Sequence, residues 1–113
     1  MKIEDLKNYG ANIEEGLHRC MDNESFYLRL VKMIPDDPAF EKLYAAIGAG
    51  NLDAAFEAAH SLKGSTGNLA LTPISAPVTE ITELLRARTQ TDYSALTDAI
   101  RKGRDDLARL CEN

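Results

Sequence analysis

The sequence predicts an all-α fold, an antiparallel up-down four-helix bundle with additional short N-terminal helices. Three observations lead to this fold class. Apolar residues recur at three- and four-residue spacings along most of the chain. Asn, Asp, Gly and Pro interrupt that spacing at intervals suited to ordinary helix lengths. The interruptions are short, which favours antiparallel neighbouring helices.

The length of the chain predicts a single domain spanning residues 1–113, with N-terminal helices at about 1–22 and the bundle at about 23–113. A chain of 113 residues can bury a core without disulfides or a structural metal. Cys20 and Cys111 lie far apart and match no metal-ligand spacing, so we expect reduced thiols in a cytoplasmic protein.

The charge and hydropathy of the chain exclude several classes of partner. A net charge of -5 disfavours nucleic acid, whose phosphates require a basic face. No apolar run approaches the ~20 residues that span a bilayer, and the N-terminus lacks the apolar stretch of a secretory signal. We therefore expect no nucleic-acid or membrane partner, and a monomer, because four helices close a core by themselves.

The N-terminal segment predicts two short helices. Ile3 and Leu6 suit the first of them. Asn12 is a good N-cap for the second, and Glu15 stands three residues later, the spacing of a capping box. The apolar residues of this second helix are Ile13, Leu17 and Met21.

The next two helices are separated by proline. Asn23 caps a helix that Pro35 ends by removing a backbone donor. Its apolar stripe is Phe26, Tyr27, Leu30, Val31 and Ile34. Asp37-Pro38 starts the following helix, and the stretch "GAGN" ends it. Its stripe is Phe40, Leu43, Tyr44 and Ile47.

Three longer helices complete the predicted bundle. Asn51 caps the first, whose core-facing residues are Leu52, Ala55, Ala59, Leu62, Thr66 and Leu69. Thr72-Pro73 opens the second, with Ile74, Val78, Ile81 and Leu85 facing inward. Thr91-Asp92 opens the third, whose apolar residues are Tyr93, Leu96, Ile100, Leu107 and Leu110.

His60 is predicted to face away from the core. At ~100° of rotation per residue, it points about 130° from the stripe that runs from Leu52 to Leu69. Lys63, Gly64 and Gly67 lie on the same outward strip, and Phe56 and Glu57 share that face one turn earlier.

The two glycines on this strip weaken the helix by roughly 0.5–1 kcal/mol each relative to alanine. Small residues of this kind either allow a close helix contact or leave a surface bare for another molecule. A contact within the bundle would place Gly64 and Gly67 on the side of Leu62, and they fall with His60 instead. The angle therefore favours a bare surface.

The stretch "HSLKGSTGNLAL" resembles the signature of histidine-containing phosphotransfer (HPt) domains, which reads His-x-Leu-Lys-Gly followed by small residues and an aliphatic one. The matching residues are His60, Leu62, Lys63, Gly64, Ser65, Gly67, Asn68 and Leu69. Length and helix order agree over almost the whole chain. Ala70 departs from the pattern because many members have glycine there. Pro77 falls in the following helix, which either begins near Val78 after a looser lead-in or is kinked.

The resemblance implies a phosphorelay intermediate that accepts a phosphoryl group on His60 from a receiver-domain aspartyl phosphate and passes it to another receiver. Expected partners are response-regulator receiver domains, a hybrid sensor histidine kinase, or both. The chain needs no cofactor of its own, and Mg²⁺ is expected from the receiver. The sequence holds no Gly-rich nucleotide loop and no carboxylate cluster with Mg²⁺ spacing, so we expect a carrier without autonomous catalytic activity.

The residue chemistry supports the same roles. A solvated, neutral imidazole offers a ring nitrogen that attacks phosphorus. Lys63, the only cation on the strip, can offset the charge of the transferring group. Phe56 offers an apolar anchor for a docking receiver. Glu57 and Ser61 either hydrogen-bond the second ring nitrogen of His60 or form plain solvated surface, and the surface role is favoured.

Two other functions compete with the carrier. A docking module with the same scaffold would use this face without phosphorylation, but it would not need both His60 and Lys63. A hydrolase with His60 as its base lacks a nucleophile and a pocket. Arg86 and Arg88 near a helix C-terminus complement the helix dipole and need no ligand. A further basic run alternates with aspartates and is expected to be a solvated face; it contains Arg101, Lys102 and Arg104.

Overall fold

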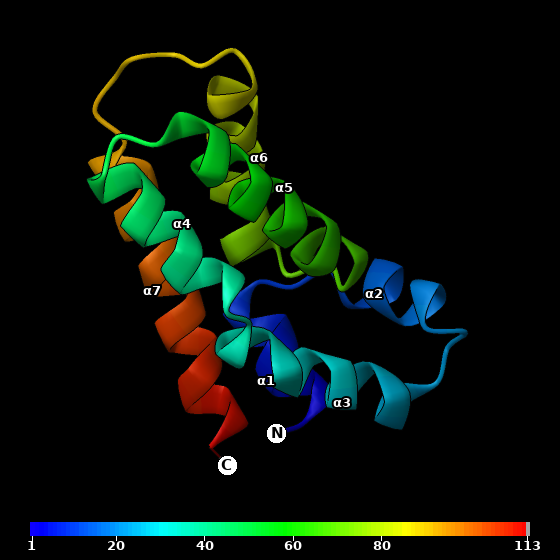
Figure 1. Cartoon of the computed structure of the whole chain (residues 1–113). Coiled ribbons are helices and arrows are strands. Elements are labelled where there is room, and N and C mark those ends of the chain that lie inside the picture. The colour runs from blue at the N-terminus through cyan, green and yellow to red at the C-terminus, as the bar shows by residue number, and fades with distance from the viewer. Residues whose placement is uncertain (113) are drawn as a thin grey trace.

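Every regular element in the computed structural model, which describes residues 1–112, is a helix (Figure 1). The elements are α1 (Ile3–Tyr9), α2 (Ile13–Arg19), α3 (Glu24–Met33), the 3-10 turn η1 (Ile34–Asp36), α4 (Ala39–Gly48), α5 (Leu52–Asn68), α6 (Thr72–Arg86) and α7 (Ser94–Cys111). The all-α prediction is confirmed, and the helices form a bundle. Within residues 1–112, no helix combines the length and apolar character needed to cross a bilayer.

Asparagine caps set the starts of three helices, as predicted. Asn12, Asn23 and Asn51 each accept a hydrogen bond from the backbone N–H three residues later, with N···O distances of 3.3, 3.1 and 3.1 Å. Each cap satisfies a backbone donor that has no partner inside its own helix. These side chains fix the first turn of each helix, and the helical spacing of apolar residues begins there.

The second short helix differs from its prediction in two details. Glu15 does not complete a capping box, because the backbone N–H of Asn12 donates to the Ala70 carbonyl at 2.9 Å. Met21 does not continue the apolar stripe, because the helix ends at Arg19. Met21 adopts a left-handed φ of 56° and is 82% exposed, and the neighbouring Cys20 is buried in its place.

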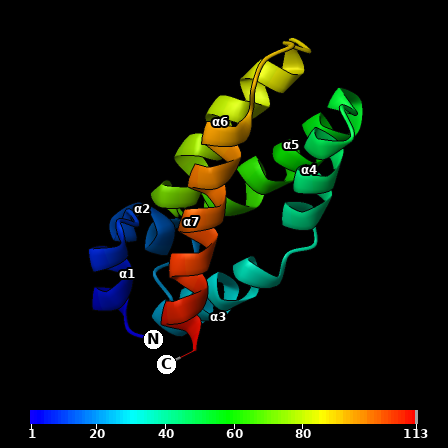
Figure 2. The same ribbon diagram turned by 90° about the vertical axis from the view of Figure 1, so that its left-hand side faces the viewer.

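The core lies between the four C-terminal helices. Helix α5 packs against α4 on one side and α6 on the other, and α6 packs along α7 (Figure 2). The predicted stripes of α5 and α6 are buried over most of their length: Ala55, Ala59, Leu62, Thr66, Leu69, Ile74, Val78, Ile81 and Leu85. Leu6, Ala11 and Cys20 belong to the same core, so the N-terminal helices share it.

Two arginines join α7 to the opposite side of the bundle. Arg104 donates to the Glu41 carboxylate at 2.7 Å and to the Pro35 carbonyl at 2.9 Å. The guanidinium of Arg101 lies 3.7 Å from the ring centroid of Tyr44. The prediction of a solvated face is therefore wrong for Arg104, which is half-buried because α7 packs beside α4 and offers it a carboxylate and a carbonyl. Arg101 is exposed, as predicted, although it lies over the Tyr44 ring.

Pro77 lies inside α6, which begins at Thr72, so the prediction of a looser lead-in is wrong. Proline has no N–H to give the Pro73 carbonyl, one turn earlier. Gly103 of α7 approaches this carbonyl so closely that a Cβ at position 103 would lie 2.8 Å from its oxygen. The glycine thus lets α7 cover the backbone oxygen that the proline leaves without its helical partner.

The end of α5 is held by contacts from the N-terminal helices. The Tyr27 hydroxyl donates to the Leu69 carbonyl at 2.8 Å. A Cβ at Gly16 would lie 2.6 Å from the Tyr27 ring and 2.8 Å from the Leu69 oxygen. Ala70 adopts a left-handed φ of 55°, a conformation that favours glycine, so the glycine that the resemblance implies there would suit this backbone.

Candidate functional site

His60 lies on the outward face of α5 and is exposed, as predicted. Its neighbours Ala59 and Leu62 are fully buried, so the helix turns its apolar side to the core and its imidazole to the outside. The direction follows from rotation along one helix and needs no other element.

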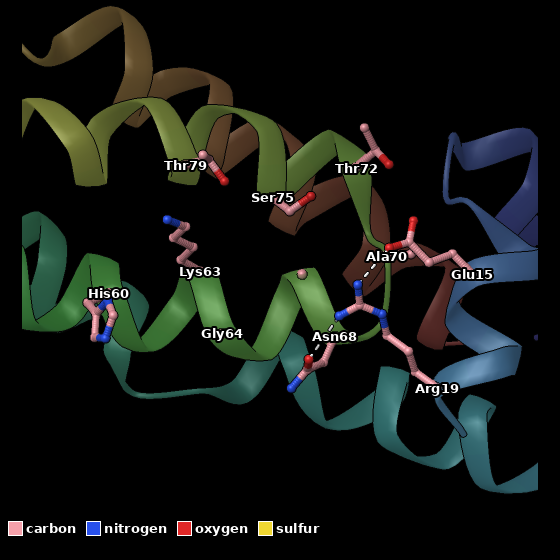
Figure 3. A pocket seen from close by; sticks show the side chains of 11 residues that line it. Glu15, Arg19, His60, Lys63, Gly64, Asn68, Ala70, Thr72, Ser75 and Thr79 are labelled. Atoms are coloured by element: carbon pink, nitrogen blue, oxygen red, sulfur yellow. Dashed lines mark hydrogen bonds and ion pairs between the residues drawn. The ribbon is translucent and has the colours of Figure 1, made fainter. Parts of the chain in front are cut away.

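His60 stands at the edge of a surface groove of about 480 Å³ that runs between α5 and α6 to the side of α2 (Figure 3). Lys63, Gly64 and Gly67 line this groove with it. The remaining lining residues are Glu15, Arg19, Asn68, Ala70, Thr72, Ser75 and Thr79. The residues of the predicted outward strip are therefore together along one wall.

The two glycines of the strip leave space rather than permit packing. A Cβ placed at Gly64 or Gly67 would meet nothing within 4 Å apart from adjacent residues and the local helix backbone. The alternative of a close helix contact is excluded for both positions, and the prediction of a bare surface is confirmed. An incoming molecule can approach the α5 backbone here beside the imidazole.

Phe56 stacks on His60, with ring centroids 5.7 Å apart and an interplanar angle of 18°. The guanidinium groups of Arg86 and Arg88 lie 5.1 and 5.0 Å from the Phe56 ring centroid. Phe56 is half-buried. Its ring supports the imidazole and two cations of this chain, in addition to the docking role predicted for it.

Sequence reasoning missed the place of these two arginines over Phe56. Arg88 donates to the Leu85 carbonyl at 2.7 Å, as a residue that complements a helix C-terminus should, and it also pairs with Asp53 at 2.6 Å. The signal was present in the predicted topology. An antiparallel neighbour of α5 brings its last turn beside the first turns of α5, where Asp53 and Phe56 stand.

Lys63 is not a free cation. Its Nζ lies 3.3 Å from Oε1 of Glu83 on α6, and the other oxygen of Glu83 lies 3.3 Å from Nε of Arg86. The hydrogen bond from Lys63, followed by that from Arg86, lowers the pKa of the Glu83 carboxyl below its usual value. Glu83 was not among the predicted site residues, because nothing in its local sequence indicates a partner on another helix.

Glu57 and Ser61 lie apart from the groove beside His60. They line a second groove, between α4 and α5. Within residues 1–112, neither side chain hydrogen-bonds the imidazole. This placement agrees with solvated surface, the interpretation favoured from the sequence.

In the described part of the chain, no group of three or more His, Cys, Asp or Glu side chains could hold a metal ion. Cys20 and Cys111 are free thiols.

The family model of the Hpt domain matches residues 31–112, from the end of α3 through α7, which includes the α5 and α6 walls of the groove. Comparison with curated proteins and with solved structures gave no match. Because the match spans most of the chain, the protein belongs to the Hpt domain family, whose members carry phosphoryl groups on histidine in phosphorelays.

Proposed function

We propose that this protein is a phosphorelay carrier that accepts a phosphoryl group on His60 from the aspartyl phosphate of a receiver domain and passes it to another receiver. The observation that carries the proposal is the exposed imidazole beside bare helix backbone at Gly64 and Gly67. An exposed nucleophile with space around it suits a reaction whose other reactant lies in a second protein.

The transfer makes one bond and breaks one bond. A ring nitrogen of His60 forms a bond to phosphorus as the bond between phosphorus and the aspartyl oxygen breaks, and the aspartate leaves as a carboxylate. The remaining ring proton passes to solvent as the product becomes neutral at the ring. Lys63, one turn along the same wall, can approach the phosphoryl oxygens as a point charge.

The receiver completes the chemistry in this proposal. It supplies the phosphorylated aspartate and Mg²⁺, and the present chain contributes a nucleophile, a cation and a docking face, without autonomous catalytic activity. A hybrid sensor histidine kinase is the expected source of the relayed group. Phe56, Gly64 and Gly67 form the part of the docking face nearest His60.

The proposal includes a single domain over residues 1–113 that acts as a cytoplasmic monomer. The shared core of the N-terminal helices and α4–α7 supports one domain. We also propose the finer architecture, in which α4, α5, α6 and α7 form an antiparallel up-down four-helix bundle. It is supported by the order of helix packing and by the reversal of the chain between each of these helices and the next (Figure 1).

Transfer from a radiolabelled phosphorylated receiver tests the function. A panel of receiver domains is incubated with the wild type, His60→Gln and His60→Ala. We expect the wild type to gain label that acid removes and alkali preserves, because phosphohistidine is acid-labile, and both variants to gain none. Label that survives acid, equal labelling of the variants, or receiver binding with no labelling from any receiver would contradict the carrier and favour a docking module.

A further inference from the structure

The side chains of His60 and Lys63 leave α5 in different directions. Figure 3 shows Lys63 reaching across the groove toward α6, whereas His60 points away from that helix. The ammonium group is held there by Glu83, at 3.3 Å. A cation expected to serve the imidazole is therefore bound to a carboxylate on the neighbouring helix.

We propose that Glu83 is a positioning residue that holds Lys63 against α6 while His60 is unphosphorylated and releases it to the phosphoryl group once His60 carries one. The inference rests on the proposed function and adds a residue that regulates the same site.

Lys63 can exchange the Glu83 carboxylate for a phosphoryl group, because its side chain is flexible and the ion pair is exposed. Its ammonium is a compact charge on a flexible stem, and its side chain is 37% exposed, beside a Glu83 side chain that is 53% exposed. Ion pairs this exposed are weak, equivalent to roughly a two- to fivefold preference. A phosphoryl group carries close to two negative charges against one for a carboxylate, so it can draw the ammonium away.

Arg86 makes the exchange easier for Glu83. Its Nε lies 3.3 Å from the Glu83 oxygen that Lys63 does not use. The carboxylate therefore keeps one cation when the lysine leaves. The result is a competition for Lys63 that weakens the phosphorylated state by a small factor, which suits a carrier that must give its phosphoryl group away.

Loading of His60 by phosphoramidate measures this competition without any receiver. A ring nitrogen bonds to phosphorus as the phosphorus–nitrogen bond of phosphoramidate breaks, and ammonia leaves and takes up the ring proton. The variants are Glu83→Gln, Lys63→Ala, their combination, and Glu80→Gln. Glu80 is the matched control, an exposed glutamate one turn earlier on α6.

We expect Glu83→Gln to raise the initial loading rate, or to lengthen the phosphohistidine half-life, by about two- to fivefold, and Glu80→Gln to change neither. In the Lys63→Ala background, Glu83→Gln should have no effect, because the competition acts through the lysine. An equal effect in both backgrounds, an equal effect of Glu80→Gln, or no effect would overturn the proposal.

The carboxyl group of Glu83 provides a second readout. The charged side chains paired with it are Lys63 from α5 and Arg86 from its own helix. Departure of the lysine removes the larger cause of its lowered pKa, so phosphorylation should raise this pKa, and by more in the wild type than in Lys63→Ala. An NMR titration of the carboxyl carbon checks this, and an unchanged pKa would contradict the exchange.

The two proposals fail in different experiments. If phosphoramidate loading responds to Glu83→Gln while no receiver labels the wild type, the carrier function is wrong and the competition for Lys63 stands. If receivers label His60 and Glu83→Gln behaves as Glu80→Gln does, the function stands and the role of Glu83 is wrong.

Discussion

Two pairs of glycines in this protein serve opposite purposes. Gly64 and Gly67 lie on the outward face of α5, where an added Cβ would meet nothing within 4 Å beyond its local surroundings. Gly16 and Gly103 lie at helix junctions, where the same Cβ would come within 2.6 to 2.8 Å of its nearest neighbour. One pair keeps a surface accessible, and the other lets backbones approach each other.

The two pairs show that the role of a helical glycine depends on which atoms lie opposite it. At the junctions the opposing atoms belong to the chain itself and include the carbonyl oxygens of Leu69 and Pro73 and the ring of Tyr27. Beside His60, the space is open, and in the proposed function another protein supplies the opposing surface. The junction pair should therefore respond to substitution through stability, and the open pair through transfer.

The largest expected effect on stability is at the closed junction. Gly16→Ala should lower the free energy of unfolding by about 2–3 kcal/mol, because the added methyl group overlaps the Tyr27 ring and the Leu69 carbonyl. Urea denaturation measures the change. Gly48→Ala is the control, at a helical glycine whose added Cβ has open space, and it should not destabilise. Equal stability of Gly16→Ala and the wild type would show that the junction is loosely packed.

A smaller effect is expected from Tyr27→Phe, which removes the hydroxyl that bonds the Leu69 carbonyl. At pH 7, the variant should lose about 1 kcal/mol of unfolding free energy. Burial raises the pKa of Tyr27 to about 12, whereas a free tyrosine ionises near pH 10. The neutral phenol therefore stabilises the folded state below pH ~10, and this contribution is lost as the pH rises toward about 12.

The difference between Tyr27→Phe and the wild type should therefore narrow between pH 10 and 12. Urea denaturation at pH 7 and at alkaline pH checks both parts. A difference that stays constant with pH would mean that Tyr27 ionises equally well in the folded protein.

A substitution on the open face is expected to have the smallest effect on stability, and to stabilise the protein rather than destabilise it. Gly64→Ala should raise the unfolding free energy by about 0.5–1 kcal/mol, since alanine is the better helix former and meets no obstacle. Transfer from a receiver should slow by about tenfold, equivalent to roughly 1.4 kcal/mol of lost contact, whereas loading by the small donor phosphoramidate should not change. Unchanged receiver transfer would show that the partner does not approach the helix at Gly64.

Much of the fold was predictable because the deciding interactions are local. Asn23 and Asn51 cap their helices from one residue before the start, and the stripe of α5 is buried as its spacing predicts. The outward direction of His60 follows from the same stripe. Met21 departed from its pattern because the chain turns at the end of α2 and buries Cys20.

The predictable part of the candidate site is likewise confined to one helix. His60, Lys63, Gly64 and Gly67 lie together because helical rotation alone relates them. Their roles in transfer stay predictions until labelling tests them. The partners of these residues on α6 could not be found in this way, because side-chain pairing between helices depends on how far one helix slides along the other.

The sequence by itself determined where α2, α3 and α5 begin, which side of α5 faces the core, and that an imidazole stands outside with bare backbone near it, because caps and periodicity act over a few residues. Only the tertiary structure decided that Lys63 is held by Glu83, that two arginines lie over Phe56, and that Gly16 and Gly103 admit neighbouring carbonyls. These contacts join residues far apart in the chain, and their geometry exists only once the helices are packed.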